Sequence, residues 1–449
     1  MKRKIYDKLV EWKKEAKGAY ALLIDGAHYV GKSYIATEFA KNNYKSYILI
    51  DFYKAPMEVK SLFDNYLDNL DDLFMYLSNY YGVTLYERDT LFIFDEVQMY
   101  PRARAAIKYL VADGRYDYIE TGSLISIREN VKDILIPSEE WHINMYPMDF
   151  EEFLWALGND SLMDFIKECF EKKRPLGELL HRKTMDYFRK YMIVGGMPQA
   201  VSEYVKTGDF VKTDIIKRNI LNLYRDDIRK HAGKYSLKVE SIFDEIPAQL
   251  QKHEKKFKIT SLDKNAKSRD YDDAFLWLTD AMIVNSCFNT TEPSIGLRLN
   301  MDNSTLKLYM ADTGLLISHA FDENGIVKEE VYKKILFDKL EFNSGMIVEN
   351  VVAQMLNASG HKLFFYSNAA KENENRMEID FLICKGTVTN RHNISPIEVK
   401  SGKNYTLVSL NKFKNKYFKE LDVAYVVHPG DLKVDQGIVY LPLYMTCLL

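Results

Sequence analysis

The sequence predicts an α/β fold whose first part is a parallel, doubly wound sheet. Three observations predict it. Apolar runs of strand length alternate with segments of helical spacing. A glycine-containing loop joins the first such strand to the helix that follows it. A later apolar run ends in an acidic pair, as a buried parallel strand does where it reaches the edge of an active site.

The loop is the first of these signals to carry chemistry. It reads Gly26-Ala27-His28-Tyr29-Val30-Gly31-Lys32-Ser33 and fits the phosphate-binding pattern G-x-x-x-x-G-K-S/T. An apolar run at 19–25 precedes it, and a helical pattern at 34–42 follows. Glycines let the backbone amides approach phosphate oxygens, the lysine reaches the β- and γ-phosphates, and the serine ligates Mg²⁺. The plainer alternative is a glycine turn that precedes a helix by chance.

The acidic pair, Asp95 and Glu96, ends the apolar run that begins at Thr90. Asp95 is placed to support Mg²⁺, and Glu96 is placed to polarise the attacking water. The alternative is a strand followed by an acidic helix cap. A further strand is expected over 116–123, where the hydroxyls of Thr121 and Ser123 would lie between the carboxylates and the γ-phosphate.

These residues resemble a known family. The loop, the Asp95 strand, the 120–123 segment and the motif at 146–153 look like bacterial and archaeal ATPases of the AAA+ class. The resemblance implies a P-loop sheet with an additional strand, a helical lid, a winged-helix region and a nuclease-like domain. It maps the polar residue of the fourth strand to Ser123 or Thr121. An arginine finger acting in trans would require a homo-oligomer, and its candidates here are Arg102, Arg104, Arg115 and Arg128.

The expected domains are an ATPase domain with its lid at 1–205, a winged-helix-like region at 206–330 and a nuclease-like domain at 331–449. In the middle region, a helix–turn–helix–strand order runs from Ile259 to Val284 and fits a winged helix. Basic residues crowd its first half: Lys252, Lys255, Lys256, Lys258, Lys264, Lys267 and Arg269. They either contact DNA phosphates or form a solvated basic face.

The last domain carries a PD-(D/E)xK-like pattern. Asp380 lies on one expected strand, and Glu398 and Lys400 lie two residues apart on the next, so alternation puts them on one face. Asp380 and Glu398 are oxygen ligands suited to Mg²⁺ or Mn²⁺, and Lys400 would activate water. Glu349 resembles the family's helix glutamate, a further metal ligand. The alternative is an inert remnant that serves contacts.

Composition excludes several classes of protein. A net charge of −3 implies no strong global attraction to nucleic acid or membrane, and four scattered cysteines form no zinc or disulfide pattern. The N-terminus has no apolar signal segment, and no stretch approaches the roughly 18 apolar residues of a membrane span. We therefore expect a cytoplasmic protein with no membrane partner.

The function expected from the sequence is Mg²⁺-dependent ATP hydrolysis that regulates DNA binding or cleavage by the last domain. The alternative is a nucleotide-switched interaction module whose inert last domain binds a protein partner. A third hypothesis is a DNA-binding ATPase that uses the last domain only to hold DNA.

Overall fold

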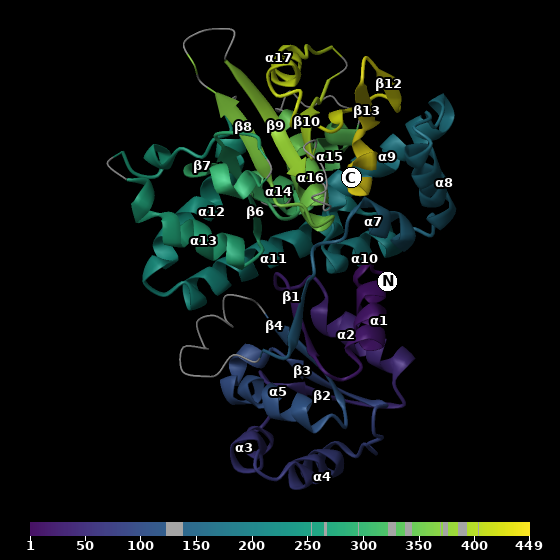
Figure 1. Cartoon of the computed structure of the whole chain (residues 1–449), viewed down its shortest axis with the longest axis vertical. Coiled ribbons are helices and arrows are strands. Elements are labelled where there is room, and N and C mark those ends of the chain that lie inside the picture. Colours follow the sequence, from purple (N-terminus) through teal and green to yellow (C-terminus); the bar gives the residue numbers. More distant parts are fainter. Residues whose placement is uncertain are drawn as a thin grey trace. The chain divides into compact units, whose positions relative to one another are not determined.

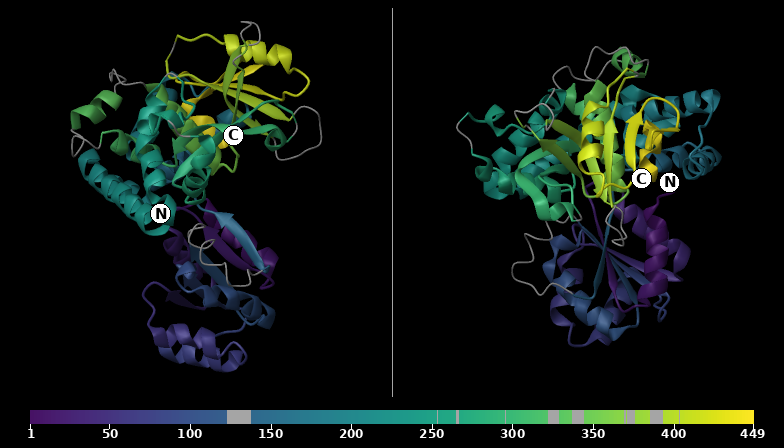
Figure 2. Two further views of the ribbon diagram at one scale, coloured as in Figure 1. Left: turned by 90° about the vertical axis from the view of Figure 1, so that its left-hand side faces the viewer. Right: turned by 45° about the horizontal axis from the view of Figure 1, so that its top comes forward.

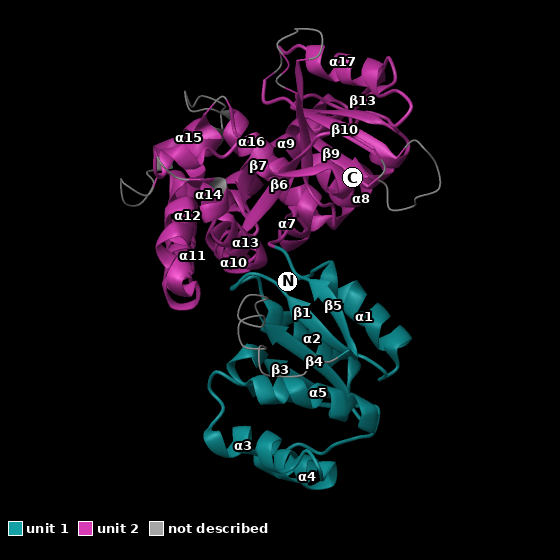
Figure 3. Cartoon of the chain, turned by 60° about the vertical axis from the view of Figure 1, so that its left-hand side comes forward, with its two compact units in different colours: residues 1–146 teal, residues 147–449 magenta. Residues whose placement is uncertain are grey.

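The structure is a computed structural model of the 449-residue chain. It describes residues 1–122, 138–252, 254–264, 267–294, 296–321, 329–336, 344–368, 370, 376–384, 393–402 and 404–449. The chain forms two compact units, Met1–Tyr146 and Pro147–Leu449 (Figure 3). The three-domain division expected from the sequence stays a prediction.

The first unit contains a parallel sheet with the strand order β2-β3-β4-β1-β5 among its described strands (Figure 1). Every neighbouring pair in this sheet is parallel. β4 lies between β1 and β3, so one additional strand separates the strand before the loop from the strand that ends in the acidic pair. The strands are β1 (Ala21–Asp25), β2 (Ser46–Asp51), β3 (Thr90–Asp95), β4 (Asp117–Gly122) and β5 (Glu140–Asn144).

Helices cover both faces of this sheet, which explains why its strands are apolar on both sides. Phe92 and Phe94 of β3 face a core built with α3, α4 and α5. The helix that follows the loop packs on the opposite face, where Phe39 meets Trp12 of the first helix. The helices are α1 (Ile5–Ala16), α2 (Lys32–Asn43), α3 (Met57–Asn65), α4 (Leu70–Tyr81) and α5 (Pro101–Asp113).

Most of the second unit before its first strand is helical. Its described helices are α7 (Phe150–Ala156), α8 (Asp160–Glu171), α9 (Glu178–Val194), α10 (Pro198–Thr207), α11 (Phe210–His231), α12 (Ser236–Gln251), α13 (Asp272–Asp280), α14 (Thr313–Ala320), α15 (Glu329–Leu336), α16 (Ser344–Ala358) and α17 (Val408–Lys416). The helix expected to begin at Ile259 is only a 3-10 turn, Ile259–Ser261.

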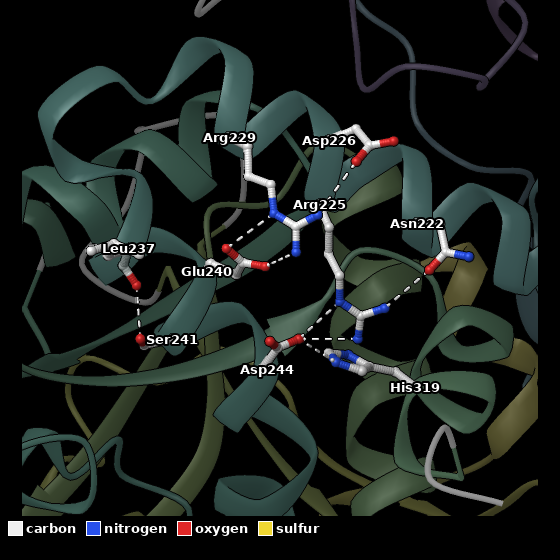
Figure 4. Close-up of polar contacts among 9 residues, drawn as sticks. All are labelled: Asn222, Arg225, Asp226, Arg229, Leu237, Glu240, Ser241, Asp244 and His319. Atoms are coloured by element: carbon white, nitrogen blue, oxygen red, sulfur yellow. Dashed lines mark hydrogen bonds and ion pairs between the residues drawn. The ribbon is translucent and has the colours of Figure 1, made fainter.

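Ion pairs join α11 to α12 (Figure 4). Arg225 donates to Asp244 at 3.0 Å, and Arg229 donates to Glu240, one turn later in α11 and one turn earlier in α12. His319 of α14 lies 3.3 Å from the same Asp244 oxygen. Arg225 and Arg229 are thus neutralised within the fold, although the middle region carries an excess of basic residues.

The second unit also contains a mixed sheet, with the order β12-β13-β11-β10-β9-β8-β6-β7 among its described strands. Two further views show these strands side by side (Figure 2). The hairpin β6–β7 joins the later strands because β6 pairs in parallel with β8. The strands are β6 (Val284–Thr290), β7 (Met301–Met310), β8 (Phe364–Asn368), β9 (Met377–Cys384), β10 (Ile394–Val399), β11 (Ala424–His428), β12 (Lys433–Asp435) and β13 (Ile438–Pro442).

Within the described ranges, none of the helices combines the length and the apolar character that a bilayer crossing needs.

Candidate functional site

The glycine-containing loop connects the carboxyl end of β1 to the start of α2. A Cβ atom added to Gly26 would lie 2.4 Å from the carbonyl oxygen of Met145, so no larger residue fits without moving backbone. Gly31 adopts a φ of +98°, in the left-handed region that favours glycine. Tyr29 also has a positive φ, of 69°. Side chains would not allow the backbone to follow this tight path at either glycine.

Lys32 is the first residue of α2, and its side chain turns back to the loop. Its ammonium group donates to the carbonyl oxygens of Gly26 at 2.8 Å and Ala27 at 3.0 Å. The residue is only 5% exposed. The positive charge is therefore held at the loop itself, beside the amino end of a helix whose dipole has the same sign.

Asp95 at the end of β3 collects hydrogen bonds from two neighbouring elements. The Ser33 hydroxyl donates to Asp95 Oδ1 at 2.6 Å, and the Thr121 hydroxyl donates to the same oxygen. Asp95 is 8% exposed, and burial raises the pKa of its carboxyl while these two hydrogen bonds oppose the rise. Loop, third strand and fourth strand thus meet at one carboxylate oxygen.

Glu96 leaves the strand through a strained backbone conformation. Its φ of 52° and ψ of 47° lie in the left-handed region, which is costly for a residue with a side chain. Its backbone amide donates to Thr121 Oγ1 at 3.3 Å, and Gln98 Nε2 donates to Glu96 Oε2 at 2.5 Å. The sequence reasoning gave no role to Gln98, although a polar residue two positions after an acidic pair is a usable signal.

Of the two predicted fourth-strand residues, Thr121 contacts both members of the acidic pair. Ser123 lies outside the described residues. The hydroxyl of Thr121 therefore has the contacts expected of a polar residue at this strand end.

A buried charge cluster lies on the same sheet. Arg104 is 2% exposed and donates to Glu140 at 2.9 Å, with the fully buried Glu120 carboxylate 4.0 Å away. His142 lies 3.3 Å from Asp25 and 3.4 Å from Glu140. Burial and pairing remove Arg104 from the candidates for a finger acting on another subunit.

The other finger candidates differ in their surroundings. Arg115 pairs with Asp113 and Asp71, and Arg102 pairs with Asp64 near the surface. Arg128 lies outside the described residues.

In the second unit the PD-(D/E)xK-like residues lie on adjacent strands. The backbone amide of Val399 on β10 donates to Asp380 Oδ2 of β9 at 2.8 Å. Lys400 Nζ donates to Glu398 Oε1 at 2.7 Å, as expected for side chains on one face. Burial first, and then the charges of Glu398 and Glu349, raise the pKa of Asp380 well above its usual range.

Two lysines from outside this pattern reach the same carboxylates. Lys307 of β7 places Nζ 2.8 Å from Glu378 Oε1 and 4.0 Å from Asp380 Oδ1. Lys255 donates to Glu349, which also accepts from Tyr309 at 3.2 Å. We call Glu349, Glu378, Asp380 and Glu398 the carboxylate centre. Sequence reasoning missed Lys307 and Glu378 because nothing local links β7 to β9.

Lys255 requires a correction. The sequence predicts that it contacts DNA phosphates or lies on a solvated basic face, but it is 9% exposed and paired with Glu349. Its neighbours are also bonded within the fold: Lys256 to Ser367 at 2.7 Å, and Lys258 to Glu254 at 2.7 Å.

The expected metal ligands Asp380, Glu398 and Glu349 share one electrostatic environment, because burial first, and then the charges of the other two, raise the pKa of Asp380. Their role as metal ligands stays a prediction. Across the described part of the chain, no group of three or more His, Cys, Asp or Glu side chains is placed to hold a metal ion.

Comparison with family models divides the chain into three matched stretches. Residues 19–154 match the model described as an AAA domain. Residues 185–324 and 344–446 match models described as domains of unknown function, DUF8612 and DUF4143. The chain thus carries a P-loop ATPase domain of the AAA class, with the parallel α/β sheet predicted for it. No curated protein sequence matches the chain.

Three solved structures are similar to parts of the chain. A Walker-type ATPase of Pyrococcus abyssi is 15% identical, with a TM-score of 0.42 over 70% of this chain and 94% of that one. The Aeropyrum pernix ORC1 protein in complex with DNA is 12% identical, with a TM-score of 0.29 over 73% and 94%. AMPPCP-bound DnaA from Aquifex aeolicus is 13% identical, with a TM-score of 0.26 over 63% and 88%. Scores below 0.5 do not establish a common overall architecture.

Proposed function

We propose that the first unit binds ATP with Mg²⁺ and hydrolyses it. One observation carries this proposal: the Ser33 hydroxyl and the Thr121 hydroxyl both bond one oxygen of Asp95, directly beside the phosphate-type loop. Ligands of open parallel sheets bind at the carboxyl ends of the strands. All three residues lie at that edge, on elements that are neighbours through the β3–β4–β1 order.

The residues present fit a triphosphate and a magnesium ion. A Cβ atom at Gly26 would collide with the backbone of Met145. Glycine at this position lets the backbone amides of the loop come close to phosphate oxygens. Ser33 and Asp95 offer hydroxyl and carboxylate oxygens, the ligand type that Mg²⁺ prefers, 2.6 Å apart. When bound, Mg²⁺ supplies positive charge to the phosphate oxygens.

Each residue of the chain then has a distinct task. The amides of residues 26–31 and the amino end of α2 bind phosphate oxygens, and Lys32 adds its ammonium charge. Glu96 accepts a hydrogen bond from the attacking water and orients it. Gln98 and Thr121 position Glu96 through its carboxylate and its backbone amide.

The test compares two substitutions in the purified full-length chain. Lys32→Ala should lose most of its ATP affinity because the loop loses its cation. Glu96→Gln should retain ATP binding while turnover falls about 10²–10⁴-fold, the usual contribution of a general base. Fluorescent-nucleotide titration and phosphate release measure the two quantities.

The matched controls are Lys14→Ala and Glu15→Gln, which alter exposed residues of α1. Both should behave as wild type. Hydrolysis by Glu96→Gln at the wild-type rate would show that the assigned base is wrong.

Two finer functions are candidates for the second unit. In the first, ATP hydrolysis regulates DNA binding or cleavage by Asp380, Glu398, Glu349 and Lys400. In the second, the chain is a nucleotide-switched interaction module, and the carboxylate centre is inert. The pairing of Lys255 with Glu349, and the position of Lys307 Nζ 4.0 Å from Asp380, favour the second, since protein ammonium groups already lie beside carboxylates that a nuclease would use for metal.

A further inference from the structure

The carboxylate centre of the second unit is supplied with positive charge by the protein itself. Lys255 pairs with Glu349, Lys307 with Glu378, and Lys400 with Glu398. Of these, only Lys400 belongs to the strand pattern that predicted a metal site. The other two come from the segment before the last domain.

Lys307 connects two strands that are not neighbours in the sheet, β7 and β9. It stands on β7, where Cys287 of β6 is its register partner, and its Nζ passes 4.9 Å from the ring centroid of Phe365 on β8. It ends 2.8 Å from Glu378 Oε1 on β9. The Lys307–Glu378 ion pair therefore bridges the sheet face between β7, the edge strand among the described strands, and β9.

Burial makes this ammonium group expensive to keep charged unless carboxylates surround it. Lys307 is 2% exposed. Its ion pair with Glu378 at 2.8 Å and the Asp380 carboxylate 4.0 Å away stabilise the charged form of the ammonium group. Lys307 thus stays a cation inside the centre.

The bulge in β9 helps to bring the centre together. Phe364 pairs with Leu382, but Tyr366 pairs with Ile379, so β9 contains one extra residue at this point. Bulges redirect side chains and are common next to functional sites. Asp380 lies in this extra-residue stretch and lies 4.0 Å from Lys307 Nζ.

One carboxylate oxygen of the centre has no such partner. Glu398 is 8% exposed, and its Oε2 atom makes no hydrogen bond within the described structure, while Oε1 accepts from Lys400. A buried, unbonded carboxylate oxygen is costly and is the kind of atom that a nearby cation compensates.

We propose that Lys307 is the resident cation of the carboxylate centre and excludes divalent metal ions from it. The Lys307 ammonium group lies 2.8 Å from Glu378 and 4.0 Å from Asp380, so it already supplies positive charge at the place where a divalent ion would contact these carboxylates. Removing Lys307 would leave both carboxylates without this charge, and a divalent ion could then supply it. The inference is independent of ATP hydrolysis by the first unit.

The experiment measures Mn²⁺ binding to the full chain without nucleotide, by electron paramagnetic resonance of free Mn²⁺. Wild type and Asp380→Asn should bind Mn²⁺ equally weakly. Lys307→Met should gain one Mn²⁺ site per chain, at least about tenfold tighter, since ligand charge count sets affinity for such ions. Lys307→Met combined with Asp380→Asn should lose it.

Two controls separate charge from general disturbance. Lys307→Arg keeps the cation and should gain no site. Lys416→Met removes an exposed lysine of α17 that belongs to no ion pair of the centre named above, and should also gain none. Thermal unfolding and the ATP hydrolysis rate show whether each variant is folded.

Two outcomes would overturn the proposal: tight Mn²⁺ binding by wild type that Asp380→Asn abolishes, or a folded Lys307→Met without a new site. If Lys307→Met does not fold, the comparison of wild type with Asp380→Asn still decides, because a metal site present in the first and lost in the second contradicts a resident lysine, and equal weak binding supports it.

Discussion

At the scale of single residues, His142 shows how the charge cluster is coupled to the start of the loop. Its imidazole lies 3.3 Å from Asp25, the last residue of β1, and 3.4 Å from Glu140. Hydrogen bonding to Asp25 first, and then to Glu140, raises the pKa of His142 to about 9. Arg104 and Glu120 are the other charged groups of the same cluster.

This pKa predicts how stability depends on pH. A group with a folded pKa of about 9 and an unfolded value of about 6.5 stabilises the fold fully below the lower value. The contribution is lost as pH rises through about 9. We expect the thermal midpoint of His142→Gln to fall less steeply than that of wild type between about pH 6.5 and about pH 9.5. The difference should be small, because solvent screens the ion pairs of a half-exposed side chain. An unchanged slope would show that His142 is not the titrating group.

Residue identity predicted much of the candidate nucleotide site. Two short local patterns carried the prediction: the loop, with Gly26, Lys32 and Ser33, and the acidic pair Asp95 and Glu96. The structure brings Ser33 and Asp95 into contact. The acidic pair and the loop are predictable because each is a short segment whose chemistry is read from adjacent letters.

The contacts that span the sequence were not predictable in this way. Lys307 reaches Glu378 across 71 positions through strand pairing that no local period encodes. Side-chain type at Lys307 gives no sign that it is buried.

At the scale of elements, the turn after α9 is a packing junction. A Cβ on Gly196 would lie 2.0 Å from the carbonyl oxygen of Met148. Its amide donates to the fully buried Asp312 at 2.5 Å, and Asp312 also caps α14 through the amide of Leu315. The close approach of the Met148 backbone explains why residue 196 is a glycine.

Gly196→Ala should therefore destabilise the second unit. The added methyl group meets backbone that cannot yield, and overpacking of this kind costs about 1–3 kcal/mol. Urea unfolding followed by fluorescence measures the change. Gly402 is the matched control: a Cβ there has no atom within 4 Å, so Gly402→Ala should stay within about 0.5 kcal/mol of wild type. Equal stability of the two variants would contradict the packing explanation.

The hairpin β6–β7 shows that elements can be predicted from the sequence when their pairing partners cannot. The helix-then-strand order that predicted a winged helix is present as α13 followed by β6, and the winged-helix assignment stays a prediction. The order of elements along the chain does not predict that Phe288 pairs in parallel with Phe364. This pairing joins the β6–β7 hairpin to the strands that follow it in the sequence. Pairing partners distant in sequence leave no periodic signal, because alternation specifies a face and not a neighbour.

At the scale of the whole molecule, the ATPase domain was the most predictable part. Its strands alternate with helices along the chain, so each local segment agrees with the parallel sheet that they build. The second unit was harder because its sheet draws on both the expected middle region and the expected last domain. The order of the strands in the sheet of the second unit was not predicted from the sequence.

The two candidate functions for the second unit differ in one measurable reaction. Supercoiled plasmid is incubated with the full chain and Mg²⁺ or Mn²⁺, with and without ATP, and nicking is followed on a gel. Because ammonium groups pair with Glu349, Glu378 and Glu398, we expect wild type to leave the plasmid intact under all four conditions.

Two variants make this result decisive. Asp380→Ala removes a carboxylate that metal-dependent cleavage would require, so nicking by wild type that disappears in Asp380→Ala would establish the nuclease and reject the inert module. Lys32→Ala tests the nucleotide: nicking that needs ATP and is lost in this variant would couple cleavage to the first unit. Intact plasmid, together with weak DNA binding that does not change with salt concentration, supports the interaction module. Binding through DNA phosphates would weaken as the salt concentration rises.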